Sequence, residues 1–81
     1  MNLFVLITSY KDGLLVRLVG DVKPERCKHS SPWMIIAQED STMVSVALSM
    51  YMAGNRKANV FVSDETTFSY CRITQYAPDV M

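Results

Sequence analysis

The chain has 81 residues, of which 49% are hydrophobic and 20% are charged. This length fits one domain, residues 1–81, and the composition lies outside the low-hydropathy, high-charge range of disordered chains. Eight basic residues balance eight acidic ones, so the formal net charge is zero. A protein without net positive charge has no general attraction for phosphate backbones, which argues against nucleic acid as a partner.

The first part of the chain predicts a β-hairpin. Leu3 to Tyr10 is rich in β-branched and aromatic residues, and a turn with Gly13 at positive φ follows it. The second strand, Leu14 to Gly20, places Leu14, Val16 and Leu18 on one face. The other face carries Leu15, Arg17 and Val19, a mixed set that we expect to be only partly buried.

The middle of the chain predicts a loop, a short strand and a helix. Asp21 to Pro32 holds charges and two prolines and reads as a loop, and Trp33 to Ala37 reads as a short buried strand. The helix is expected at Ser41 to Ala53, because Asp40 or Ser41 can cap its start and Gly54 is a strong stop.

The predicted helix is apolar around most of its circumference. Only a narrow stripe, Thr42, Ser45 and Ser49, is polar. A helix of this kind in so small a domain needs more than one surface to cover it, so we expect one side on the sheet and another on a neighbouring subunit. The residues predicted at the subunit interface of this homo-oligomer are Met43, Val46 and Met50.

The last part of the chain predicts two more strands. Lys57 to Ser63 alternates strictly, a polar turn is expected at Asp64 to Thr67, and Phe68 to Tyr76 alternates again before a frayed tail at Ala77 to Met81. The fold class is therefore β-rich α+β. Five strands with one helix between the third and fourth is the order of an OB-like barrel, and a generic α+β roll is the alternative.

Cys27 and Cys71 are 44 positions apart, a spacing that matches neither a zinc knuckle nor a redox Cys-x-x-Cys motif. A disulfide between them would stabilise the fold by roughly 4 kcal/mol through loop closure. It would also place the protein in a secreted or periplasmic compartment. The alternative is two separate thiols in a cytoplasmic protein.

Candidate ligand-binding residues come from the aromatic and basic side chains near the strands. Tyr70, Arg72 and Tyr76 share one face of the last predicted strand, with types suited to stacking on a base or a sugar ring. Trp33 has two possible places. It is predicted either to form the floor of a ligand site or an interface anchor, or to pack in the core. Ordinary packing is the alternative for all four.

No motif predicts catalysis, a metal or a cofactor. His29 is the single histidine, and its neighbours Ser30 and Ser31 lie on a loop where triad geometry is rare. The acidic pairs Glu39–Asp40 and Asp64–Glu65 lack the spacing of a calcium loop, so we expect Asp40 to cap the helix. No stretch approaches the length of a membrane span, so no membrane insertion is expected.

Gly13 to Tyr76 resembles small exported bacterial OB-fold proteins that include the B subunit of subtilase cytotoxin and related pentameric toxin B subunits. The resemblance rests on Cys27 before the third strand, on "ALSMYMAGNRKANVFV" at the helix end, and on Cys71 in the final strand. It implies a glycan-binding ring that delivers a partner A subunit, with the helices lining the centre of the pentamer.

The leading hypothesis is a non-enzymatic, exported bacterial binding module that self-associates and recognises a glycan or a protein. The alternative is a cytosolic regulatory or accessory domain that contacts proteins and keeps both thiols free. A third hypothesis is an OB-fold protein that binds single-stranded nucleic acid.

Overall fold

The computed structural model describes residues 3–20, 24, 26–27, 31–67 and 70–78. These residues form five strands and one helix. The elements are β1 (Leu3–Tyr10), β2 (Gly13–Leu18), β3 (Met34–Ala37), α1 (Ser41–Met52), β4 (Lys57–Thr67) and β5 (Tyr70–Pro78). The β-rich class and the helix between the third and fourth strands are as the sequence predicts.

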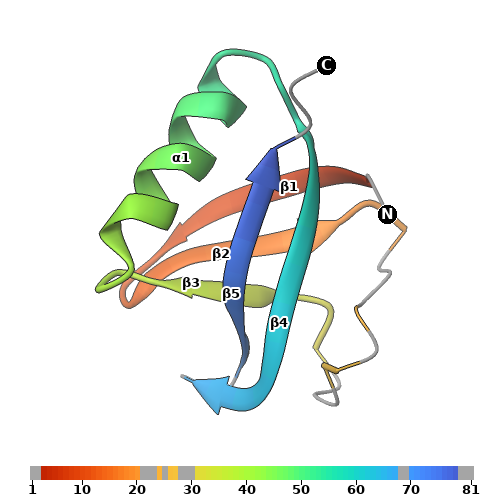
Figure 1. Cartoon of the computed structure of the whole chain (residues 1–81), viewed down its shortest axis with the longest axis vertical. Coiled ribbons are helices and arrows are strands. Elements are labelled where there is room, and N and C mark those ends of the chain that lie inside the picture. The colour runs from red at the N-terminus through yellow and green to blue at the C-terminus, as the bar shows by residue number, and fades with distance from the viewer. Residues whose placement is uncertain (1–2, 21–23, 25, 28–30, 68–69, 79–81) are drawn as a thin grey trace.

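The strands are hydrogen-bonded in the order β1-β2-β3-β5-β4, and β1 also pairs with β4, so the sheet closes into a barrel (Figure 1). All neighbouring strands are antiparallel except β3 and β5, which run parallel. At the β1–β4 junction, Ala58 pairs with Leu3 on one side and with Pro78 on the other. The first and last strands of the chain therefore flank the start of β4.

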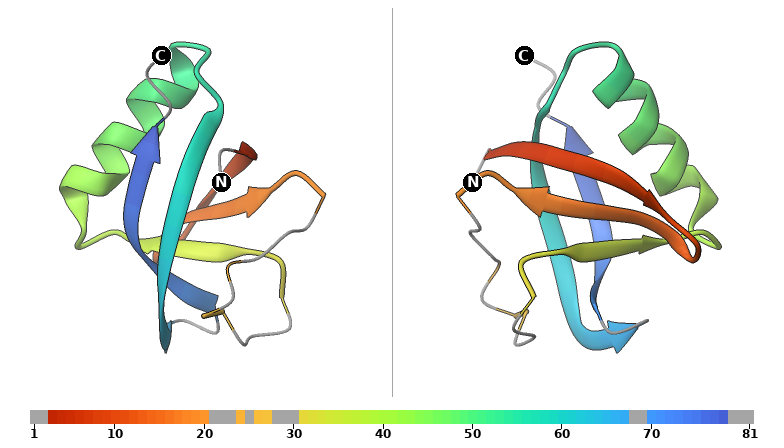
Figure 2. Two further views of the ribbon diagram at one scale, coloured as in Figure 1. Left: turned by 45° about the vertical axis from the view of Figure 1, so that its right-hand side comes forward. Right: turned by 180° about the vertical axis from the view of Figure 1, so that it is seen from behind.

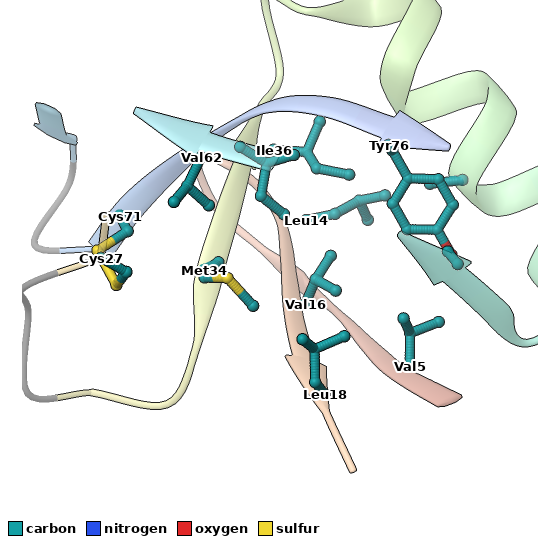
Figure 3. Packing of buried hydrophobic residues seen from close by; sticks show 13 residues of the cluster. Val5, Leu14, Val16, Leu18, Cys27, Met34, Ile36, Val62, Cys71 and Tyr76 are labelled. Carbon is teal, nitrogen blue, oxygen red and sulfur yellow. A yellow bond between two sulfur atoms is a disulfide. The ribbon is translucent and has the colours of Figure 1, made fainter. Parts of the chain in front are cut away.

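Residues at alternate positions fill the interior of the closed sheet. Val5, Val16, Met34 and Ile73 are at most 1% exposed, and they belong to one hydrophobic cluster (Figure 3). Successive side chains of a strand point to opposite faces, which is why the alternation in the sequence indicated most of these positions. The predicted inward face of β2, with Leu14, Val16 and Leu18, is buried.

The helix lies outside the sheet and packs on β5 and β3, as the two views in Figure 2 show. Ala47 is its only fully buried residue, and Met43, Val44 and Tyr51 pack partly against the core. The helix thus packs on the sheet by one side, as predicted, while other apolar side chains of the helix are exposed in the single chain. Val46 and Leu48 are each 37% exposed and Met52 is 83% exposed.

Two predicted boundaries in the last part of the chain differ from the structure. The polar run Asp64 to Thr67 is not a turn, because β4 continues through Thr67 and the next described strand begins at Tyr70. Ala77 is not part of a frayed tail, since it pairs with Asn59 inside the sheet. Polar composition suggested turns and ends here, but cross-strand pairing decides where a strand stops.

A β-bulge in β5 reverses the side-chain alternation expected for this strand. Phe61 pairs with Gln75, but the next β4 residue, Val62, pairs with Ile73, which leaves Thr74 as an extra residue. The Thr74 hydroxyl donates to the carbonyl oxygen of Phe61 at 3.2 Å. An extra residue shifts the strand by one position. Tyr76 therefore points into the core with 6% exposure, rather than outward with Tyr70 and Arg72 as predicted.

The sulfur atoms of Cys27 and Cys71 lie at disulfide distance, 2.07 Å, so the structure joins the β2–β3 connection to β5 (Figure 3). Cys71 pairs with Met34 in the parallel β3–β5 junction. Both half-cystines are buried in the core cluster. The bridge therefore fastens the closed sheet at the place where two strands distant in sequence meet.

Gly13 lies where the backbone of β3 and the residue after it pass close to β2. Its φ is +150°, and a Cβ at this position would meet the carbonyl oxygen of Ile36 and the amide nitrogen of Gln38. Because those neighbours are backbone atoms of β3 and of the residue that follows it, moving them aside would cost conformational free energy. We expect Gly13→Ala to lower the free energy of unfolding by about 2 to 4 kcal/mol, measured by urea denaturation.

Gly54→Ala is the matched control for this substitution. Gly54 also has a positive φ, +92°, but no atom lies within 4 Å of where its Cβ would stand. Its substitution carries only the conformational cost, about 1 kcal/mol. Equal losses in the two variants would show that the close approach at Gly13 contributes nothing.

The covalent link gives a second test of the fold. We expect Cys27→Ala with Cys71→Ala to lower the free energy of unfolding by roughly 2 to 4 kcal/mol, because the unfolded chain regains loop entropy. Urea denaturation of the wild-type protein should show a lower midpoint after a reductant is added, whereas the double variant should not respond. If the reductant left the urea midpoint of the wild-type protein unchanged, that result would contradict a disulfide between Cys27 and Cys71.

Candidate functional site

The outer face of β2, β3 and β5 carries apolar residues that are nevertheless buried. Leu15 pairs with Ile35, and Ile35 pairs with Arg72, so these three side chains share the face opposite the core. Leu15 is 7% exposed and Ile35 is fully buried. Neither belongs to the core cluster, so they form a separate apolar floor under the polar and aromatic side chains around them.

Two tyrosines reach over this floor from opposite sides. Tyr10 ends β1 and Tyr70 begins β5, and their rings meet edge to face with centroids 5.5 Å apart. Because β2 and β3 lie between β1 and β5 in the sheet, this contact bridges the face that carries Leu15 and Ile35. The two tyrosine rings and the buried apolar pair therefore belong to the same side of the sheet.

Trp33 and Arg17 lie at one border of the same face. The guanidinium carbon of Arg17 is 5.2 Å from the centroid of the Trp33 ring. Trp33 precedes β3 directly, and Arg17 lies one position beyond Val16, the partner of Met34. Trp33 is half-buried, so the structure places it beside the floor and not in the core.

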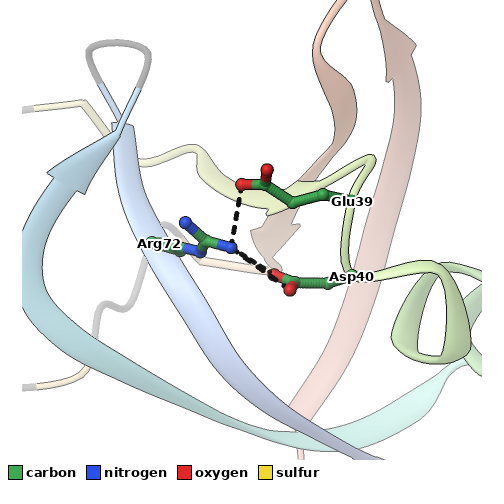
Figure 4. Close-up of polar contacts among 3 residues, drawn as sticks. All are labelled: Glu39, Asp40 and Arg72. Atoms are coloured by element: carbon green, nitrogen blue, oxygen red, sulfur yellow. Dashed lines mark hydrogen bonds and ion pairs between the residues drawn. The ribbon is translucent and has the colours of Figure 1, made fainter.

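Arg72 connects the floor to the start of α1. Its Nη2 atom lies 3.0 Å from Oδ2 of Asp40 and 3.1 Å from Oε1 of Glu39 (Figure 4). Asp40 is the N-cap residue of α1, yet its side chain makes no capping hydrogen bond. The predicted capping role is therefore wrong, because the carboxylate accepts hydrogen bonds from Arg72 instead.

A groove of about 440 Å³ begins beside this ion pair, between the first turns of α1 and β5. Its walls combine the carboxylates of Glu39 and Asp40 with the apolar side chains of Met43 and Val46, and with Gln75. Two of the predicted interface residues, Met43 and Val46, thus line a groove in the single chain. The third, Met50, is half-buried on the helix, and the oligomer stays a prediction.

Three of the four predicted ligand residues come together on this face, which we call the aromatic face and define as Tyr10, Arg17, Trp33, Tyr70 and Arg72. Tyr76 is not among them, because the bulge at Thr74 turns its ring inward. The sequence reasoning missed Tyr10 and Arg17. A signal for Arg17 was its alternation with Leu15 on the mixed face of β2, whereas the contact of Tyr10 with Tyr70 joins residues 60 positions apart and has no local signal.

The arrangement suits binding through stacking, ion pairs and hydrogen bonds. Aromatic faces bind flat or apolar ligand surfaces, while arginine and carboxylate groups bind polar ones. Within the described part of the chain, no group of three or more histidine, cysteine or acidic side chains is placed to hold a metal ion. His29 and Ser30 lie outside the described residues, as does the predicted strand residue Phe68.

No family model, curated protein or solved structure matches this chain. The resemblance to toxin B subunits therefore stays an expectation drawn from the sequence pattern. Among the described residues, no helix has the length and apolar character needed to cross a membrane.

Tyr76 supplies a test of the bulge and of the core. Its hydroxyl is buried without a hydrogen-bond partner among the described residues, and leaving such a group unpaired costs about 1 to 3 kcal/mol. We expect Tyr76→Phe to raise the free energy of unfolding by about 1 kcal/mol, measured by urea denaturation at neutral pH. A loss of stability would show that the hydroxyl has a partner.

The titration of Tyr76 gives an independent readout. Burial, reinforced by the nearby Tyr51, raises the pKa of Tyr76 above its ordinary value of 10.0. At pH values well below 10.0, the Tyr76 phenol is protonated in both the folded and the unfolded chain, so its contribution to stability does not change with pH. At higher pH the unfolded chain loses the proton first, and stability falls. Unfolding measured across alkaline pH should show a shallower fall in Tyr76→Phe than in the wild type.

Proposed function

We propose that this chain is a non-enzymatic OB-fold binding module whose aromatic face binds a glycan. The observation that carries the proposal is the gathering of three aromatic and two arginine side chains over a buried apolar floor on one side of the sheet. Half-buried aromatic rings held by a sheet are suited to ligand recognition, because little side-chain order must be gained on binding.

The position of this face supports the OB-fold assignment. OB-folds are five-stranded barrels that bind oligonucleotides and oligosaccharides on the face of strands two and three and on the loops between strands one and two and between strands four and five. Trp33 and Arg17 belong to β3 and β2 or their borders. Tyr10 precedes the β1–β2 turn, and Tyr70 follows the β4–β5 connection.

A sugar suits the charges of this face better than a nucleic acid does. The formal net charge is zero, and the Glu39 and Asp40 carboxylates lie against Arg72. Carboxylates repel phosphates but accept hydrogen bonds from sugar hydroxyls, while the apolar side of a sugar ring packs on an aromatic ring. Glu39 is 66% exposed at its side chain and is available for such a bond.

Export and self-association belong to the same proposal. A disulfide between Cys27 and Cys71 persists in oxidising compartments and is rare in the cytosol, which supports secretion or a periplasmic location. The exposure of Val46 and Leu48 on α1 supports a neighbouring subunit on the helix. A ring of the toxin B-subunit kind is one form of this assembly, and recognition of a protein instead of a glycan is the second candidate for the exposed apolar side chains.

Screening on a glycan array, followed by calorimetric titration of the glycans that bind, tests the proposal. We expect Trp33→Ala and Tyr70→Ala each to weaken binding by about 5- to 100-fold, since one stacking interaction contributes about 1 to 3 kcal/mol. Phe61→Ala is the matched control, because Phe61 is an exposed aromatic residue on β4, away from the aromatic face.

Three outcomes would contradict the proposal. Equal weakening by Phe61→Ala would place the ligand elsewhere, and tighter binding to single-stranded oligonucleotides at low salt than to any glycan would favour the nucleic-acid hypothesis. A clean monomer in size-exclusion chromatography with light scattering would remove the ring. Circular dichroism of each variant checks that the sheet is intact.

A further inference from the structure

Large apolar side chains are exposed at the end of the molecule where β1 and β4 begin and α1 ends. Phe4 is 54% exposed, Val19 is 50% exposed and Met52 is 83% exposed. Two cationic residues, Arg56 and Lys57, lie among them and are also exposed. We call these five residues the cationic apolar end.

Backbone and side-chain contacts join three residues of this end into one row. The amide of Val19 donates to the carbonyl oxygen of Phe4 at 2.9 Å. Phe4 pairs with Lys57 across β1 and β4, and the Lys57 Nζ atom lies 5.1 Å from the centroid of the Phe4 ring. These three residues therefore form one row across the outer side of the sheet.

The helix end joins this row through Arg56. The guanidinium carbon of Arg56 lies 4.3 Å from the ring centroid of Tyr51, the residue before Met52. The carbonyl oxygen of Arg56 accepts a hydrogen bond from the amide of Val5, beside Phe4. The polypeptide passes directly from the end of α1 into β4 (Figure 1), and Arg56 is the residue before β4.

The carboxylates of Asp12, Glu39 and Asp40 lie at the other end of β1 and α1. Asp12 occupies the β1–β2 turn, and Glu39 and Asp40 precede α1. The amide of Gln38 donates to the carbonyl oxygen of Asp12, which brings the turn and the start of the helix together (Figure 1). A chain with no net charge thus separates these carboxylates from Arg56 and Lys57.

We infer that the cationic apolar end is a peripheral docking surface for a membrane with anionic headgroups. Apolar side chains enter the boundary between headgroups and acyl chains, while nearby cations bind anionic lipids. Exposed Phe4 beside Lys57 combines an apolar and a cationic group, and the exposed Met52 follows Tyr51, which contacts Arg56. A nucleic acid would use the cations but would leave Met52 in water. This inference does not depend on the glycan site, which uses other side chains.

Co-sedimentation with vesicles tests this surface in the full chain. We expect the protein to bind vesicles of phosphatidylcholine mixed with phosphatidylglycerol, to bind phosphatidylcholine vesicles far more weakly, and to be released by added salt. Lys57→Gln and Arg56→Gln should each weaken binding about fivefold, since one cation near an anionic surface contributes about 1 kcal/mol. Met52→Ser and Phe4→Ser should weaken it as well.

Phe61→Ser is the matched control for Phe4→Ser, because Phe61 is 50% exposed and lies elsewhere on β4. It should bind vesicles as the wild type does. Met52→Ser changes a side chain that is mostly in solvent, so it keeps the test valid if Phe4→Ser unfolds. Equal binding to neutral and anionic vesicles, no binding to either at low salt, or equal weakening by Phe61→Ser would overturn the inference.

Discussion

The disulfide between Cys27 and Cys71 fixes the parallel β3–β5 junction, one of two junctions in this sheet, with β1–β4, that join strands distant in the sequence. Short connections bring β1 to β2 and β4 to β5, whereas β3 and β5 meet in parallel after 32 intervening residues. Their described register has only two pairs, Met34 with Cys71 and Ile35 with Arg72. A covalent link beside the first of these pairs lowers the entropy of the unfolded chain and keeps the sheet closed.

The same junction organises both faces of the sheet. Cys71 points into the core, and its neighbours Tyr70 and Arg72 point outward because side chains alternate along a strand. Tyr70 reaches Tyr10, and Arg72 reaches the start of α1 through Asp40 and Glu39. The proposed glycan site thus depends on side chains whose positions the bridge holds, although the bridge itself is buried beneath them.

The periodicity of the sequence predicted the features that depend on which side chains alternate along a strand or recur along a helix. It indicated the buried face of β2, the mixed character of the opposite face with Leu15 and Arg17, and the helix that begins at Ser41. It did not predict Tyr76 in the core, because one extra residue at Thr74 inverts the pattern and nothing in the sequence near it marks a bulge. The Tyr10–Tyr70 contact and the Arg72–Asp40 ion pair depend on the tertiary arrangement, which a pattern along one chain does not contain.

The pairing of Ala58 with both Leu3 and Pro78 has a consequence for folding kinetics. One edge of β4 pairs with β5, the next strand in the chain, but the other edge pairs with β1, the first strand. Contacts of high sequence separation slow folding, since a long loop must close before they form. During synthesis, β1, β2 and β3 can associate early, but the sheet closes only after β5 has left the ribosome.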